Sequence, residues 1–147
     1  MSTTLKYAAV SGLLVAGLVF SAMPSGAVVP TKTASATPGA SAAVQKEFDA
    51  FITKFRVALK ANDTAAVTSM TKHPFETGDY ANATQFRTKG YPKIFTPKNR
   101  ACIERTKGVY ERAPNSDEYY SVPCGGLFFF FTKTKAGFLF TYMSDND

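Results

Sequence analysis

Histidine and cysteine are both scarce in this sequence of 147 residues, which contains one His and two Cys. A single His excludes metal sites and catalytic arrangements that need two imidazoles. The spacing of Cys102 and Cys124 matches no zinc-ligand pattern, and a catalytic thiol is not favoured for this pair. We therefore expect no metal and no other cofactor.

The chain also has no apolar run long enough for an uncleaved membrane anchor. A spanning helix needs about 20 apolar residues, whereas the run Tyr7–Phe20 is followed within a few residues by Pro24. A preceding Lys6 and a following stretch of small residues are typical of a secretory signal peptide. We expect residues 1–27 to be cleaved after Ala27, which predicts an exported protein, periplasmic or extracellular, with no remaining membrane span.

Runs of like charge are missing as well, although the formal net charge of the chain is +6. The Lys and Arg residues are dispersed and form no recognisable nucleic-acid module, so we expect no nucleic-acid partner. A basic surface on an exported protein favours anionic partners, such as envelope polymers or acidic proteins.

Large side chains are absent from residues 28–42, which consist of small residues with Lys32 as the only charge. Such a stretch cannot bury a core and is predicted to be a flexible linker. Residues 43–147 contain all but two of the 20 Phe and Tyr residues and form a domain of ordinary size.

The first half of this domain has helical periodicity. Apolar residues from Val44 to Leu59 recur at steps of three and four, which predicts one amphipathic helix. A shorter helix capped by Asn62 or Asp63 is expected to end near Thr71, ahead of a proline.

Two further helical segments are expected before the strands begin. Residues 82–95 read as helical, with a bend imposed by Gly90 and Pro92. Thr96 and Pro97 have the pattern of an N-cap followed by proline at the first helical position of a short helix.

The second half predicts two β-hairpins, with strands at 108–112 and 118–122 and then at 127–131 and 138–143. In the Phe-rich third strand, Phe128 and Phe130 lie on the face opposite to their neighbours, because successive side chains alternate. The first helix can cover one face only. The other face needs a partner subunit, a second layer of the same chain or the inside of a strongly curved sheet, and of these we expect a homodimer.

The two cysteines are expected to be bonded to each other. A lone pair of Cys in an exported chain usually forms a disulfide. Closure of a loop of this size stabilises a domain by about 3 kcal/mol in the loop-entropy model.

The order of these elements resembles the NTF2-like (cystatin-like α+β cone) superfamily. The resemblance rests on the long first helix, the second helix, the His-Pro-Phe segment at 73–75, the Tyr-Pro-Lys-Ile-Phe segment at 91–95 and the final aromatic hairpin. The Tyr-Pro-Lys-Ile-Phe segment is similar to exported members rather than to enzymes of the group. The resemblance implies an α+β fold in which helices pack on a curved antiparallel sheet, a pocket at the mouth of the cone, and dimerisation through the sheet.

Four residues are candidates for lining such a pocket: His73, Arg105, Tyr110 and Tyr120. His73 could act as a general base beside Glu76 or Asp79, but a His before Pro is more often a turn residue. No position matches the catalytic motifs of the superfamily's enzymes, so no catalytic residue is assigned.

Three classes of function remain open. The sequence favours an exported, non-enzymatic protein that binds a small molecule or an envelope component in the cone-shaped pocket. An inhibitor or immunity factor directed against a secreted enzyme is the alternative. A small-molecule isomerase, dehydratase or hydrolase is the third, and a loss of turnover on mutation of His73 would support it.

Overall fold

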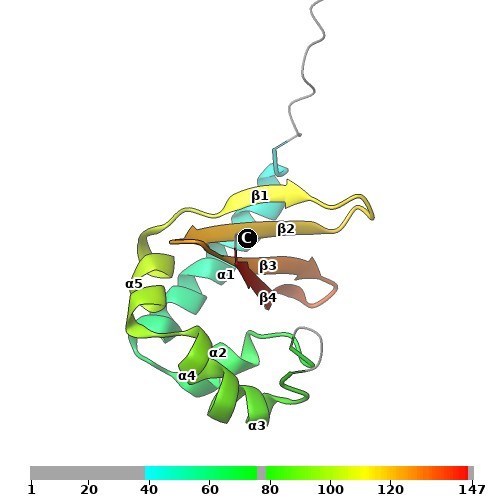
Figure 1. Cartoon of the computed structure of the whole chain (residues 1–147). Helices are drawn as coiled ribbons and strands as arrows, with labels where there is room; N and C mark the ends of the chain where they lie inside the picture. The colour runs from blue at the N-terminus through cyan, green and yellow to red at the C-terminus, as the bar shows by residue number, and fades with distance from the viewer. Residues whose placement is uncertain (1–38, 76–78, 146–147) are drawn as a thin grey trace, which may run out of the picture. The chain divides into compact units, whose positions relative to one another are not determined.

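The computed structural model describes residues 39–75 and 79–145. The predicted signal peptide and residues 28–38 of the predicted linker lie outside this part of the chain. A series of helices is followed by a four-stranded antiparallel sheet (Figure 1), which confirms the expected α+β class.

The first helix, α1, spans Ala42–Lys60. It begins at Ser41, whose hydroxyl accepts a hydrogen bond from the Val44 amide at 3.3 Å. The helix buries a stripe with the predicted periodicity, including Phe48, Phe55 and Leu59. This stripe packs against the inner face of the sheet.

Helix α2, Thr64–Ser69, starts at Asp63, whose carboxylate accepts from the Ala66 amide at 2.9 Å. It ends two residues before the predicted Thr71. The chain after α2 forms a short parallel bridge with the last strand, in which the Lys72 amide donates to the Phe140 carbonyl at 2.8 Å.

The predicted helical segment 82–95 consists of three successive pieces: α3 (Ala83–Gln85), the π-helical turn η1 (Phe86–Gly90) and α4 (Tyr91–Ile94). The predicted bend takes the form of the wider π turn. Pro92 explains it, because proline has no amide hydrogen and its ring clashes with the carbonyl four residues earlier.

Helix α5 spans Pro97–Arg105 and has the predicted cap, since the Thr96 hydroxyl accepts from the Asn99 amide at 3.3 Å. Its far end is held to α1 by Arg56, whose guanidinium donates to the carbonyls of Ile103 at 2.9 Å and Thr106 at 2.6 Å.

Gly108 connects α5 to the sheet at a point where no side chain fits. A Cβ atom there would lie 2.9 Å from the ring of Phe48 and 3.3 Å from that of Tyr120. These two rings stack with centroids 3.7 Å apart, so the backbone passes directly over a packed aromatic pair.

The sheet has the strand order β1-β2-β3-β4, and all its pairs are antiparallel. Both predicted hairpins are present. The second, third and fourth strands are longer than expected, whereas the first begins one residue later than expected. Gly125 and Gly126, both with positive φ, form the turn between β2 and β3. The strands are β1 (Val109–Arg112), β2 (Glu118–Cys124), β3 (Leu127–Thr134) and β4 (Gly137–Asp145).

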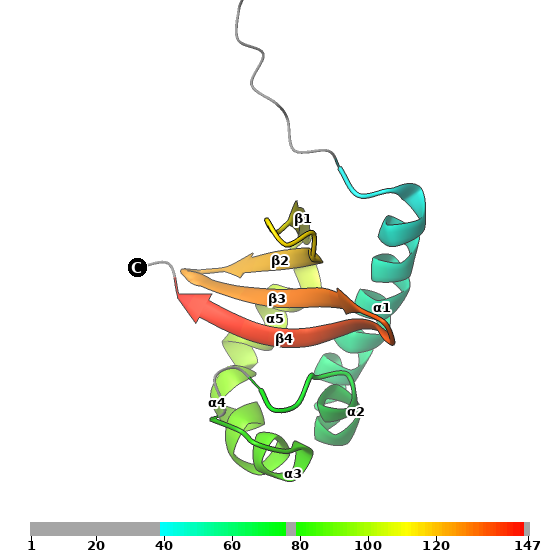
Figure 2. The same ribbon diagram turned by 90° about the vertical axis from the view of Figure 1, so that its right-hand side faces the viewer.

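The two faces of the sheet differ as the alternation in β3 predicts. Phe129 and Phe131 are fully buried under the helices, whereas Phe128 and Phe130 lie half-buried on the opposite face. Figure 2 shows the strands side by side with α5 behind them and with α2, α3 and α4 beyond the β4 edge. The space between the sheet and the helices is filled by aromatic side chains such as Phe55, Phe95 and Phe140.

In residues 39–75 and 79–145 no helix is both long and apolar enough to cross a membrane.

Candidate binding site on the outer face of the sheet

The face of the sheet turned away from α1, here called the outer face, has an aromatic half. Phe130 on β3 and Tyr142 on β4 are register partners, and their rings stack with centroids 4.1 Å apart and planes 8° apart. Tyr119 on β2 contacts Phe130 from the other side, at 5.8 Å. Tyr142 is 39% exposed, so this aromatic group reaches solvent.

The other half of the outer face is polar. Thr132 and Thr134 continue β3 beyond Phe130, and Asp117 precedes β2 on the same side. A β-bulge places Thr141 here as an extra residue, because Phe130 pairs with Tyr142 whereas Phe131 pairs with Phe140. The Thr132 and Thr141 hydroxyls are 2.8 Å apart, and Thr141 donates to the Phe130 carbonyl at 3.2 Å.

A pocket of about 540 Å³ lies where the two halves meet, and we call it the outer-face pocket. This volume falls within the range of roughly 300–1,000 Å³ that small-molecule sites occupy. The chain after α2, which contributes Lys72, borders the pocket on one side. The β1–β2 turn, which contributes Asp117, borders it on the other side. Its lining includes Lys72, Asp117, Thr132, Thr134, Thr141 and Tyr142.

The electrostatics of the outer face keep its phenols neutral. Burial raises the pKa of Tyr142, and the nearby Glu111 carboxylate raises it further. Burial likewise raises the pKa of Tyr119, whose hydroxyl also donates to Glu111 at 3.0 Å. At neutral pH these phenols are hydrogen-bonding groups and not bases. The two charged side chains that line the pocket, Lys72 and Asp117, have opposite signs.

Two of the four residues predicted to line a pocket, Tyr110 and Tyr120, lie together on the inner face. They are register partners with ring centroids 5.4 Å apart. Tyr120 is 1% exposed, and its hydroxyl donates to the Gln45 side chain on α1 at 2.7 Å. Burial raises the pKa of Tyr120 to about 12. This phenol is therefore part of the core.

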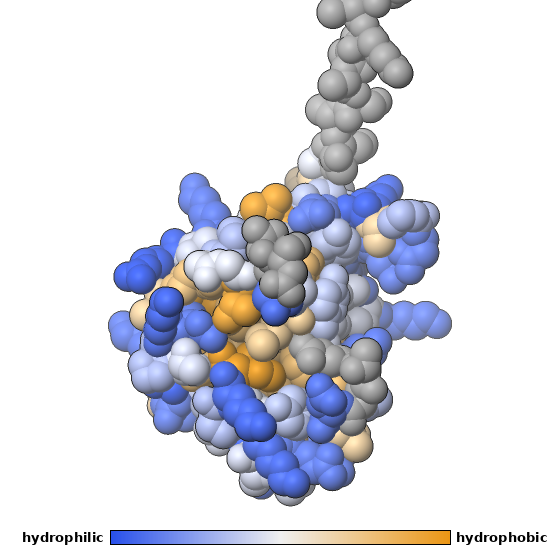
Figure 3. All heavy atoms as spheres, viewed as in Figure 1, coloured by the Kyte–Doolittle hydropathy of each residue, from blue (hydrophilic) through white to orange (hydrophobic). Residues whose placement is uncertain are grey.

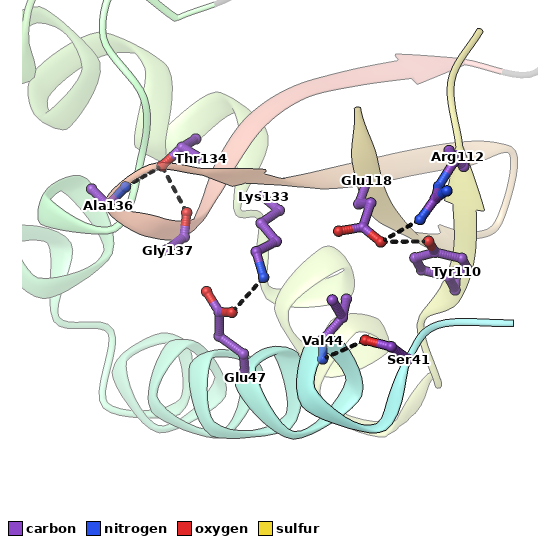
Figure 4. Close-up of polar contacts among 10 residues, drawn as sticks. All are labelled: Ser41, Val44, Glu47, Tyr110, Arg112, Glu118, Lys133, Thr134, Ala136 and Gly137. Atoms are coloured by element: carbon purple, nitrogen blue, oxygen red, sulfur yellow. Dashed lines mark hydrogen bonds and ion pairs between the residues drawn. The ribbon is translucent and has the colours of Figure 1, made fainter. Parts of the chain in front are cut away.

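Figure 4 shows the polar contacts around Tyr110 at the edge of the inner face. Glu118 accepts from the Tyr110 hydroxyl at 2.8 Å and from Arg112 at 2.9 Å, and these two hydrogen bonds lower the pKa of the Glu118 carboxyl. Lys133 on β3 forms an ion pair with Glu47 on α1 at 2.8 Å. Each of these four charged side chains is paired with another one of them. The first pair links β1 to β2, and the second links β3 to α1, so the contacts are structural.

His73, the third candidate, lies beside α2 and not next to the tyrosines. Its Nε2 atom is 3.1 Å from the Thr68 carbonyl oxygen, and its ring meets Phe86 edge-on at 5.4 Å. Nδ1 is buried, and among the described residues it has no hydrogen-bond partner. The ring borders a separate pocket of about 320 Å³. Of its two expected carboxylate partners, Glu76 lies outside the described residues, and Asp79, which is described, makes no hydrogen bond with the His73 ring.

Arg105, the fourth candidate, is exposed at the C-terminal end of α5. One turn earlier, Cys102 has its sulfur 2.16 Å from that of Cys124 on β2, which is disulfide-bonding distance. The pair joins the helices to the inner face of the sheet. Within residues 39–75 and 79–145, no group of three or more His, Cys, Asp or Glu side chains could hold a metal ion.

The residues of the outer-face pocket were not among the candidates from sequence. The alternation that places Phe130 on this face also places Thr132 there, so part of the pocket could have been found by extending the strand. Thr141 could not, because the bulge shifts its register. Lys72 joins the lining of the pocket only because the chain that follows α2 forms a bridge with β4.

The architecture, helices packed on a four-stranded antiparallel sheet, is compatible with a cone-like fold. No family model matches the chain, and searches of curated proteins and of solved structures find no match either.

Proposed function

We propose that this is an exported, non-enzymatic binding protein that recognises a small, uncharged polar ligand, such as a saccharide unit of an envelope component, in the outer-face pocket. The observation that supports this most directly is the position of that pocket between the exposed Tyr142 ring and three threonine hydroxyls.

The chemistry of the lining favours a ligand with both apolar and hydroxyl surfaces. Tyr142 offers a ring and a phenol, a combination common where a surface is apolar at one end and wet at the other. Thr132 and Thr134 bring hydroxyl groups that both donate and accept. Lys72 and Asp117 balance each other in charge, so the pocket does not select strongly for an anion or a cation.

The interior of the fold is less suited to a ligand. The ring of Phe131 is fully buried between sheet and helix, and Phe55 and Phe140 pack on it with centroids 5.2 and 5.6 Å away. These packed rings occupy the interior, where the resemblance predicted a pocket. We therefore place the ligand on the outer face.

We also propose that the chain belongs to the NTF2-like superfamily. The succession of a long helix, shorter helices and an antiparallel meander supports this relationship. Fold membership would not define the ligand, because one fold hosts many functions.

A titration by nuclear magnetic resonance tests the site. The ¹⁵N-labelled protein would be titrated with a panel of neutral mono- and disaccharides. We expect saturable shifts for at least one sugar, centred on Thr132, Thr141 and Tyr142. The variant Tyr142→Ala should weaken this binding by roughly two- to tenfold, since an aromatic contact contributes about 0.5–1.5 kcal/mol.

Val109→Ala is the matched control, because Val109 is also an exposed apolar residue of the sheet, 52% exposed on β1, and it does not line the pocket. Equal loss in both variants would contradict a specific site. Shifts of the same residues that depend on protein concentration alone would show that a second copy occupies the face. That result would support the predicted homodimer and overturn the small-ligand proposal.

A further inference from the structure

Positive charge is concentrated in the helical segment between α2 and the sheet. Residues 83–107 contain seven Lys and Arg residues and one acidic residue, Glu104. The excess in these 25 positions equals the net charge of the entire chain, +6. In Figure 3 hydrophilic side chains project along the margin formed by α3, α4 and α5. The basic excess therefore belongs to one stretch of the sequence, which forms the helical layer of α3, η1, α4 and α5.

Within this layer a pocket of about 350 Å³ is bordered by two arginines, Arg87 and Arg100. Its remaining lining is neutral, with hydroxyl groups from Thr64, Tyr91 and Thr96, and no carboxylate contributes to it. This differs from the outer-face pocket, where Lys72 and Asp117 balance each other.

Arg100 is held in place on the wall of this pocket. Its Nη1 atom donates to the side-chain oxygen of Asn62 and, at 3.4 Å, to the Phe95 carbonyl. The Tyr91 hydroxyl donates to the same Asn62 oxygen at 2.9 Å. Only one nitrogen of the guanidinium is used in these contacts, so the donors on Nε and Nη2 remain for a ligand.

Arg87 lies on η1 and borders the same pocket. It is exposed, and among the described residues it has neither an ion-pair nor a hydrogen-bond partner. Two guanidinium groups therefore border one pocket, one oriented by its neighbours and the other unpaired, without an acidic residue in the lining to neutralise them.

We propose that this pocket, defined by Arg87 and Arg100, binds a phosphate-type oxyanion. Guanidinium groups present planar pairs of N–H donors that match the oxygen atoms of a phosphate. The hydroxyls of Thr64 and Thr96 can add further donors, whereas the Tyr91 hydroxyl already donates to Asn62. The group is either free phosphate or a phosphate carried by an anionic envelope polymer. This proposal does not depend on the outer-face pocket.

Titration of the full-length exported protein with inorganic phosphate, followed by the same ¹H–¹⁵N spectra, tests the site. We expect saturable shifts centred on residues 87, 91 and 100, separate from those of the outer face. Arg87→Gln should weaken binding by about tenfold, the loss typical of a charge-assisted hydrogen bond. Arg100→Gln should have at least this effect.

Lys93→Gln is the matched control, because it removes the same charge from exposed α4 without altering the pocket lining. It should change the affinity less than twofold. An equal loss in Arg87→Gln and Lys93→Gln would overturn the site, because only the diffuse field of the basic layer would then be acting. The absence of saturable shifts would overturn it as well. The Arg87 side chain makes no hydrogen bond or ion pair with the described residues, so its variant is informative even if Arg100→Gln unfolds.

A second titration, with a short linear polyphosphate, separates the two sources of the anion. Binding more than tenfold tighter than that of inorganic phosphate, with the gain lost in Arg87→Gln, assigns the pocket to a polymer. Equal affinity for both probes assigns it to the free ion.

Discussion

The two faces of β3 carry the same residue type and have different environments. On the inner face Phe129 and Phe131 are completely buried against helices and other strands. On the outer face Phe130 is half-buried and its main contact is a parallel stack with the partly exposed Tyr142. The first environment resembles the core of any small domain. The second holds aromatic rings in a fixed arrangement at the surface.

This difference separates stability from recognition. A buried Phe contributes through the area removed from water and through the contacts that a cavity would lose. A ring held at the surface contributes less to the free energy of unfolding, because less of its area is removed from water. Its fixed position preorganises it for a partner. Mutations on the two faces should therefore have separable effects.

The largest effect is expected for Phe131→Ala on the inner face. Loss of a fully buried ring should lower the free energy of unfolding by about 3–5 kcal/mol. The neighbouring Phe130→Ala should lower it by only about 1–2 kcal/mol, because the ring is half-buried. Urea denaturation of both variants measures the difference. Equal losses would refute the distinction between the faces, and Phe131→Leu provides a milder change if the first variant does not fold.

The next effect concerns Cys124, which stands at the end of the inner face and is joined to α5. Replacing both Cys102 and Cys124 by Ser should lower the free energy of unfolding by about 3 kcal/mol, because the bond closes a loop with a sequence separation of 22. Thermal unfolding measures it, with the reduced wild-type protein as control. If the variant is less stable than the wild type but reduction does not destabilise the wild type, the two thiols are not bonded.

A smaller effect is expected for Tyr120→Phe on the inner face. The loss of the hydrogen bond to Gln45 should cost about 1 kcal/mol. Because the pKa of Tyr120 is raised from 10.0 to about 12, the phenol ionises first in the unfolded chain. Wild-type stability should therefore be complete below pH 10 and decline as the pH rises toward about 12. Urea titrations across this range should show a shallower decline in the variant, and equal slopes would contradict the assignment.

The smallest effect is expected at the partly exposed edge of the inner face, for Glu118→Gln. Hydrogen bonds from Tyr110 and Arg112 lower the pKa of Glu118 below its usual 4.5. The stabilisation is therefore present above pH 4.5 and is lost as the pH falls through the lowered value. At neutral pH the variant should lose less than about 1 kcal/mol, as for other exposed pairs. Its stability should also depend less on acid pH, and an unchanged acid dependence would contradict the role of Glu118.

Much of the fold could be predicted from the sequence, because it depends on local periodicity. The helix from Val44 to Leu59 and the alternation at Phe128–Phe131 each follow from spacing alone. The π turn before Pro92 was expected only as a bend, since a steric clash shows where a helix is disturbed but not how the backbone accommodates it. The turn at Gly125 and Gly126 was missed, although two adjacent glycines are a turn signal.

The candidate sites were harder to predict, because they depend on contacts between distant segments. Tyr120 was expected at a pocket and lies in the core, since sequence does not reveal which side of a strand faces the helix. Arg87 and Arg100 are far from Asn62 in sequence, and only the packing of α2 against the η1–α4 segment brings them to one pocket. Lys72 reaches the outer face through a bridge that no periodicity signals.

That bridge also bears on how the protein behaves at high concentration. Strands as rich in aromatic residues as β3 and β4 are prone to pair edge to edge with other molecules. Here the Met70 carbonyl and the Lys72 amide occupy hydrogen-bonding positions on the outer edge of β4. At the opposite edge of the sheet, β1 is four residues long and ends at a charged Arg112. Both edges therefore carry features that oppose edge-to-edge pairing with other molecules, even though the outer face between them is aromatic.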